Sequence, residues 1–221
     1  MTTSKTEQNS SVDNPLRDRL IHGCTALGIS LGDQQINQLL AYLALFEKWN
    51  KAYNLSAIRD INEMLVRHLL DSLSIVPFSN VGERWLDVGT GGGLPGIPLA
   101  ICFPDKQYTL LDSNGKKTRF LFQVKTELSL NNVAVEQARI ESFQAPAFDV
   151  IVSRAFASIE DMVNGSQHLL NEAGQLFAMK GQYPSEELSK LPKPFKVDRC
   201  EPLTVPFSEG DRHLLIINRE H

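Results

Sequence analysis

Residues 85–100 read W-L-D-V-G-T-G-G-G-L-P-G-I-P-L-A and decide the fold. The first four residues are mostly apolar, which predicts a short buried strand. Five glycines then crowd a loop, and apolar residues resume at Ile97, which predicts the start of a helix. A strand, a glycine-rich turn and a helix N-terminus together form a nucleotide-type ligand site. Glycine lets the main chain approach a ligand closely, and the free N–H groups of the helix start favour a polar or anionic group.

The glycines fit two ligand patterns. Starting at Gly91 the loop matches G-x-G-x-x-G, which is typical of dinucleotide sites. Starting at Gly89 it reads G-x-G-x-G, with Asp87 two residues earlier, which is the pattern of S-adenosylmethionine (SAM) sites. A dinucleotide motif needs its first glycine at the strand end. Because Val88 runs directly into Gly89, the strand favours the SAM pattern.

The composition bounds the class of protein. The chain has 221 residues, 42% of them hydrophobic, which is enough for one large domain or for a domain with a small appendage. The net charge of the chain is −4, whereas domains that bind nucleic acid are usually basic. Any RNA contact therefore needs a local basic patch. The three cysteines lie far apart and fit neither a disulfide framework nor a metal site. The polar N-terminus and the lack of an 18-residue apolar run predict a cytoplasmic protein without a membrane span.

Three predicted helices precede the glycine turn. Apolar residues recur at helical spacing over 16–27, Asp33 is the expected N-cap of a second helix, and Asp60 caps a third over 61–75. We therefore expect a disordered tail over 1–13, an N-terminal helical region packed on the sheet over 14–80, and a SAM-binding domain over 81–221. Ser113 is the expected cap of the helix that follows the second strand.

Seven strands are predicted, over 85–88, 108–111, 133–135, 148–153, 175–179, 195–200 and 213–218. No helical pattern separates the last two, which predicts that they are antiparallel. An NAD-type Rossmann sheet would instead end in a parallel strand after a helix. The sequence therefore predicts an α/β fold of the Rossmann-like, SAM-dependent methyltransferase type. Its seven-stranded sheet is mostly parallel with one antiparallel strand, and it carries an N-terminal helical extension.

Polar residues follow several strands, where ligands of open α/β sheets bind. Asp112 lies about 20 positions after the glycine loop, where an acidic residue commonly accepts hydrogen bonds from ribose hydroxyls. Glu141, Arg154 and Lys180 follow later strands. Each has an ordinary alternative, a solvated carboxylate for Glu141 and a surface strand end for the two cations. Their convergence on one edge favours a site.

Several motifs match one known family. They are W-N-K-A-Y-N-L-S-A-I at 49–58, N-E-M-L-V-R-H-L-L-D-S at 62–72, L-D-V-G-T-G-G-G-L-P-G-I-P-L at 86–99, L-L-D-S-N-G-K-K-T-R-F-L at 110–121, S-R-A-F-A-S at 153–158, M-K-G-Q at 179–182 and R-H-L at 212–214. With these motifs the chain resembles the small-subunit ribosomal RNA methyltransferase G family, also called glucose-inhibited division protein B. The resemblance implies methyl transfer from SAM to N7 of one guanine in 16S rRNA, at position 527 in the family.

The resemblance also implies residue roles. It assigns SAM contacts to Gly89, Leu94, Ile140, Glu141 and Arg154, while Gly91, Gly93 and Asp112 join the same pocket on the physical argument above. Gly92 stands where family members often carry proline or alanine, which predicts a more flexible loop. Guanine N7 carries a lone pair and no proton, so no general base or covalent nucleophile is expected. No metal is expected either. Arg154 and Lys180 are expected to act in catalysis only by positioning the reactants.

The RNA-facing surface is predicted from cations. The candidates are Lys51, Arg67, Lys116, Lys117, Lys180 and Arg212, with Lys48, Arg59 and Arg119 on the same helices or between them. Solvated helix faces remain an alternative for the helical ones. Asn54, His68 and Asp71 fall in family-like motifs, and a buried polar network is the favoured interpretation for His68. The expected partner is 16S rRNA within the small subunit or an assembly intermediate, bound by a monomer.

Three other functions stay open at this point. A SAM-dependent enzyme acting on a small molecule would share the fold, because fold does not determine substrate. A non-catalytic SAM-binding factor in ribosome assembly would share the ligand site. An NAD oxidoreductase would need a parallel sixth strand and nicotinamide binding.

Overall fold

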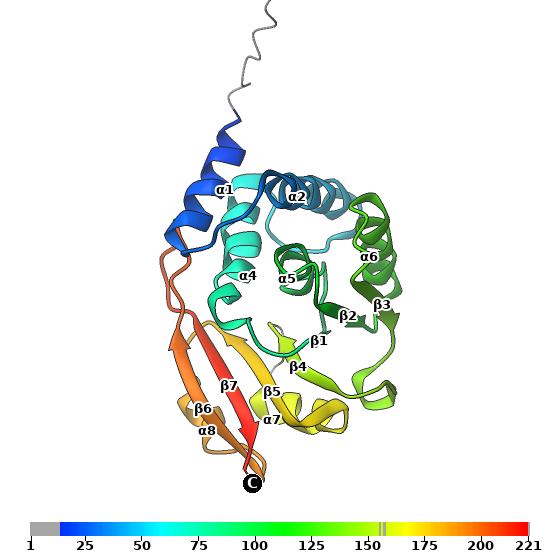
Figure 1. Cartoon of the computed structure of the whole chain (residues 1–221), viewed down its shortest axis with the longest axis vertical. Helices are drawn as coiled ribbons and strands as arrows, with labels where there is room; N and C mark the ends of the chain where they lie inside the picture. The colour runs from blue at the N-terminus through cyan, green and yellow to red at the C-terminus, as the bar shows by residue number, and fades with distance from the viewer. Residues whose placement is uncertain (1–13, 155, 157, 221) are drawn as a thin grey trace, which may run out of the picture.

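One seven-stranded sheet forms the centre of the protein, with strand order β3-β2-β1-β4-β5-β7-β6 (Figure 1). The computed structural model describes residues 14–154, 156 and 158–220, so the predicted tail over 1–13 lies outside the described residues. The strands are β1 (Arg84–Val88), β2 (Gln107–Asp112), β3 (Val133–Gln137), β4 (Phe148–Ser153), β5 (Leu170–Lys180), β6 (Phe195–Pro202) and β7 (His213–Arg219). Strand β7 is antiparallel to both neighbours, and the other pairs are parallel. The predicted methyltransferase topology, including its antiparallel strand, is confirmed.

Helices cover both faces of the sheet. They are α1 (Pro15–Ala26), α2 (Asp33–Tyr53), α3 (Ile61–Met64), α4 (Asp71–Leu73), α5 (Gly96–Cys102), α6 (Gly115–Glu127), α7 (Ile159–Ser166) and α8 (Ser185–Leu188). Side chains alternate across each strand, so Trp85 packs in the cluster under α2, α5 and α6, whereas Leu86 packs in the cluster under α7. The N-terminal helices lie on the same side of the sheet as α5 (Figure 1). Their buried side chains share the first cluster with the strands.

The predicted third helix is interrupted. Asp60 caps its start as expected, because its carboxylate accepts the N–H groups of Asn62 and Glu63. The turn then widens into a π-helical segment, η1 (Leu65–Leu70), before α4 and a 3₁₀ turn, η2 (Val76–Phe78). Such widened turns are frequently found at functional sites. Apolar spacing alone does not separate a π turn from an α turn, so the sequence predicted one continuous helix.

Two predicted helix caps are wrong by one residue. Gly32, and not Asp33, precedes α2, and the Gln35 side chain accepts the Gly32 N–H. Asp33 instead pairs with Arg17. Asn114 replaces Ser113 as the cap of α6, because the Asp112 carboxylate accepts the Asn114 N–H and so extends the loop by one residue.

Strand β5 is longer than predicted and begins at Leu170. Its early residues pair only loosely with β4, whose register shifts after Phe148. Within the described part of the chain, no helix combines the length and apolarity needed to span a bilayer.

Candidate active site

The turn after β1 is shaped by glycine. Gly89, Gly91 and Gly93 have φ values of +65°, +61° and +92°, a region that other residues rarely adopt. A Cβ on Gly89 would meet no atom within 4 Å, so this position faces open space at the sheet edge. The turn therefore leaves room for a ligand to approach the main chain.

Asp87 braces this turn from below. One of its carboxylate oxygens accepts hydrogen bonds from the Thr90 hydroxyl (2.6 Å) and the Gly96 N–H (2.8 Å). A Cβ on Gly96 would lie 2.8 Å from that oxygen, so only glycine fits there. Burial raises the pKa of Asp87 to about 6. The carboxylate thus holds the start of α5 against the strand end.

A cavity of about 210 Å³ opens between the turn and the ends of β2 and β3. We call it the carboxylate cavity, and it is lined by Val88, Gly89, Leu111, Asp112, Ser113, Ala138, Arg139, Ile140, Glu141 and Phe156. Asp112 is buried here, where it accepts the Gly91 N–H (3.0 Å) and pairs with the Lys117 ammonium (3.4 Å). Four of the residues predicted to bind SAM thus lie together, namely Gly89, Asp112, Ile140 and Glu141.

The donor set fits SAM. Two carboxylates suit ribose hydroxyls and a cationic ligand, the apolar side chains suit an adenine ring, and the open side of Gly89 leaves space for the ligand. Two further predicted residues do not line the cavity, since Leu94 is buried in the core and Gly93 lies under Ile97 and Leu121, and their SAM contacts stay predictions.

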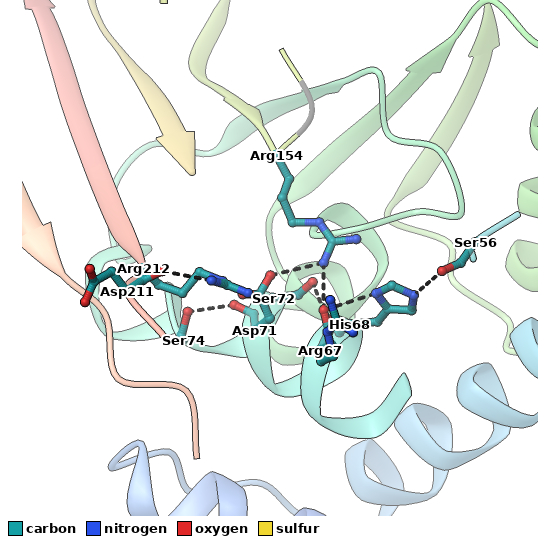
Figure 2. Close-up of polar contacts among 9 residues, drawn as sticks. All are labelled: Ser56, Arg67, His68, Asp71, Ser72, Ser74, Arg154, Asp211 and Arg212. Carbon is teal, nitrogen blue, oxygen red and sulfur yellow. Dashed lines mark hydrogen bonds and ion pairs between the residues drawn. The ribbon is translucent and has the colours of Figure 1, made fainter. Parts of the chain in front are cut away.

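A second cavity, of about 320 Å³, lies at the ends of β4, β5 and β7. We call it the arginine cavity, and its lining residues are Ile58, Arg67, His68, Asp71, Arg154, Met179, Lys180, Gly181, Leu203, Arg212 and His213. Figure 2 shows that Asp71 lies between two arginines. One Asp71 oxygen accepts from Arg154 (3.1 Å) and the other from Arg212 (3.0 Å), and the Asp71 side chain is 7% exposed.

The two cavities are neighbours. Arg154 lines the arginine cavity, and Phe156, two residues on, lines the carboxylate cavity. The Ser153 hydroxyl donates to the Val88 carbonyl (2.8 Å), which fixes the end of β4 beside the glycine turn. Arg154 therefore faces the second cavity, and the SAM contact that the family resemblance implies for it stays a prediction.

The predicted RNA-binding cations separate into two groups. Arg67, Lys180 and Arg212 line the arginine cavity, although the Lys180 ammonium pairs with Glu187 (2.8 Å). Lys51 pairs with Glu47 on α2, Lys116 is exposed on α6, and Lys117 pairs with Asp112. Neither Lys51 nor Lys116 lines either cavity. The sequence could not separate these groups, because an ion pair depends on which side chain folding brings nearby.

His68 belongs to a polar network within the protein. Its Nδ1 lies 3.1 Å from the Arg67 carbonyl, which can only accept, so Nδ1 carries the proton. Its Nε2 therefore accepts from the Ser56 hydroxyl (2.7 Å; Figure 2). Ser56 is held in turn by Asn50, whose side chain also binds Ile58. This geometry supports the buried-network interpretation.

The network makes stability depend on pH. Burial, reinforced by the positive charge of Arg154, lowers the pKa of His68 from 6.5 to about 4. The folded protein thus binds this proton more weakly than the unfolded chain, so the stabilisation is complete above pH 6.5 and is lost as pH falls through 4. We expect the free energy of unfolding to fall more steeply over this range in the wild type than in His68→Gln. Denaturant titrations at several pH values measure the difference, and parallel curves would contradict the assignment.

The sequence did not reveal what lies over the glycine turn. The Tyr42 hydroxyl of α2 donates to the Gly92 carbonyl (2.7 Å), and a Cβ on Gly92 would lie 2.2 Å from the Phe46 ring. The turn is packed under α2. This packing disagrees with the more flexible loop that was predicted from Gly92. In the sequence, the spacing of both aromatic residues indicates only that they lie on the buried face of a helix.

Comparison with known proteins agrees with the geometry. The family profile described as rRNA small subunit methyltransferase G matches residues 35–215. This chain belongs to that family. A methyltransferase G from Pseudomonas aeruginosa (strain LESB58) is 56% identical over 211 residues, which are 95% of this chain and 99% of the relative. One from Stutzerimonas stutzeri (strain A1501) is 57% identical over 212 residues, with the same coverage.

More distant solved structures share the fold of methyltransferase G. A ribosomal protein L11 methylase from Lactobacillus delbrueckii subsp. bulgaricus aligns with a TM-score of 0.53 at 20% identity, over 69% of this chain and 77% of that chain. M. jannaschii TYW2 in complex with AdoMet aligns with a TM-score of 0.53 at 16% identity, over 69% and 76%. The chain is therefore a Rossmann-like, SAM-dependent methyltransferase, and not an NAD oxidoreductase.

Proposed function

We propose that this chain methylates N7 of a guanine in the 16S rRNA of the small ribosomal subunit, acting as a cytoplasmic monomer. The observation that carries the proposal is the pair of neighbouring cavities at the carboxyl edge of the sheet. One offers carboxylates and a glycine turn, and the other offers three arginines and a lysine. SAM belongs in the first cavity and the target nucleotide in the second.

The carboxylate cavity would hold SAM through Gly89, Asp112, Ile140 and Glu141. When bound there, SAM supplies an electrophilic methyl group on a sulfonium. The buried Asp112 also holds the turn in shape through the Gly91 N–H. The carboxylate therefore serves both the ligand and the loop that receives it.

The arginine cavity is suited to a nucleotide. Guanidinium groups bind phosphate oxygens and guanine O6, whereas N7 would have to stay free of donors, because its lone pair would form the bond to the methyl carbon as the bond from that carbon to sulfur breaks. His68 is neutral at physiological pH, and its proton is committed to the Arg67 carbonyl. No base has to remove a proton from N7, so the residues act by orienting the guanine, which can lower the barrier by roughly 7–11 kcal/mol.

The boundaries 14–80 and 81–221 form part of the same proposal. The helices before β1 supply Arg67, His68 and Asp71 to the arginine cavity, and the sheet supplies Arg154 and Arg212. We assign the helical region to the nucleotide site and the sheet domain to SAM. The arginine cavity lies where the helical region and the sheet domain meet.

The decisive experiment maps N7-methylguanine in 16S rRNA from cells lacking this protein. We expect one site to lose its methyl group and to regain it when small subunits are incubated with purified protein and labelled SAM. The rate should fall steeply with salt, since phosphate contacts release counterions. An unchanged methylation map would contradict the proposal. Labelling of a metabolite instead of RNA, or SAM binding without transfer, would favour one of the alternatives.

A further inference from the structure

The arginine cavity shares lining residues with two further cavities. On one side it shares Arg67 with a cavity of about 430 Å³ that contains Arg19, Asn62 and Phe207. On the other side it shares Lys180 and Gly181 with a cavity of about 470 Å³ formed by residues 180–187. Shared lining residues therefore make the three cavities adjacent, and we call this series the path. Its shared cations are Arg67 and Lys180, the second of which is paired with Glu187.

Each outer cavity contains an exposed aromatic ring. Phe207 is 55% exposed, and its backbone has φ +64°, a strained conformation for an aromatic residue. The Arg19 guanidinium lies 5.1 Å from the ring centroid. The strained backbone and the arginine together hold an apolar ring at the surface, where more than half of it stays exposed and contributes no burial energy.

Tyr183 is the counterpart on the other side. Its side chain is 53% exposed, and its ring packs edge-on against His213, with centroids 5.8 Å apart. His213 also lines the arginine cavity. Phe207 and Tyr183 therefore flank the cavity that we assign to the target guanine.

We propose that a single-stranded RNA segment follows this path, with the bases on either side of the target guanine stacked on Phe207 and Tyr183. The inference rests on the proposed function and adds the route of the RNA strand. Proteins that bind single strands combine exposed aromatic rings with cations that follow the backbone. Glu63 and Glu209 line the Phe207 cavity and would repel a phosphate, so that cavity suits a base.

The test compares Phe207→Ala and Tyr183→Ala with the wild type on small subunits. Losing one stacked base should raise KM for the subunit about tenfold, with the effects of the two substitutions multiplying. The value of kcat and the Kd of SAM should stay unchanged. Phe207→Trp and Tyr183→Phe keep the ring and should remain within about twofold of the wild type.

Phe122→Ala is the matched control, because Phe122 is 52% exposed on α6 and lines none of the three cavities. If the alanine variants keep the wild-type KM, the RNA route is wrong while the methylation proposal stands. A raised KM that accompanies a lower Tm and is not restored by Phe207→Trp would make Phe207 an internal clamp, which also overturns the route. A wild-type protein that methylates no rRNA defeats the proposed function itself.

Discussion

Arg154→Ala is expected to lower kcat on the order of 100-fold, because a misplaced reactant alone can cost that much. Arg154 leaves the end of β4 and lines the arginine cavity, where it is the cation nearest in sequence to the carboxylate cavity. We expect the fold to change little, and the Kd of SAM tells whether Arg154 also contacts SAM. Steady-state kinetics on small subunits, with calorimetry for SAM, provide the measurement. A Kd that rises tenfold or more would place Arg154 on SAM, as the family resemblance implies.

Asp71 should prove inseparable from Arg154. Each of its oxygens holds one guanidinium, and the Arg154 and Arg212 side chains are only 25% and 31% exposed (Figure 2). Asp71→Asn keeps the shape but removes the charge, so both arginines lose their common anchor. We expect kcat to fall nearly as far as in Arg154→Ala, and the double variant to lose little more. Such non-additivity is the signature of residues that act as a unit.

We expect Asp71→Asn to affect activity far more than stability. Because both arginines can turn toward water, removing the carboxylate should lower the free energy of unfolding by only about 1–2 kcal/mol, less than for a fully buried pair. Activity should therefore fall while Tm shifts by a few degrees. Independent, multiplying losses in the double variant would show that Asp71 does not act through Arg154.

Features that depend on neighbouring residues were predicted well from the sequence. Short apolar runs ended by Gly89, Asp112 and Arg154 located three strand ends, and parallel strands bring such ends to one edge of a sheet. The missing helix between the last two strands predicted their antiparallel pairing. These inferences succeed because hydrophobic periodicity and the residues that end a strand or helix are local properties of the sequence.

Features that depend on long-range contacts were not predictable. Lys180 follows a strand end as expected, yet its ammonium pairs with the carboxylate of Glu187 in α8. Asp71 gave no signal of its contact with Arg212, which is 141 positions away in the chain. The division of one predicted site into two cavities likewise depends on where Arg154 and Phe156 lie, and sequence spacing does not encode that.

Gly92 shows how a long-range contact determines whether a position tolerates a side chain. Its backbone is not left-handed, so a side chain is excluded only by the Phe46 ring, 2.2 Å from the position of a Cβ. That ring is 2% exposed and is packed against Tyr42, His68 and Phe120, so it has little room to move. Gly92→Ala should therefore destabilise the protein by about 1–3 kcal/mol, as overpacking of a core does.

The same contact predicts its own rescue. Phe46→Leu removes the ring atoms that lie nearest to Gly92. The double variant Gly92→Ala with Phe46→Leu should therefore lose less stability than the sum of the two single losses, by about 0.5–3 kcal/mol. Denaturant unfolding measures this coupling. Gly165→Ala is the control, because Gly165 lies inside α7 with its nearest Cβ contact at 3.4 Å and should gain stability. Additive effects would mean that the turn yields to a side chain, as the flexible-loop prediction requires. Coupling would instead show that α2 fixes the turn that is to receive SAM.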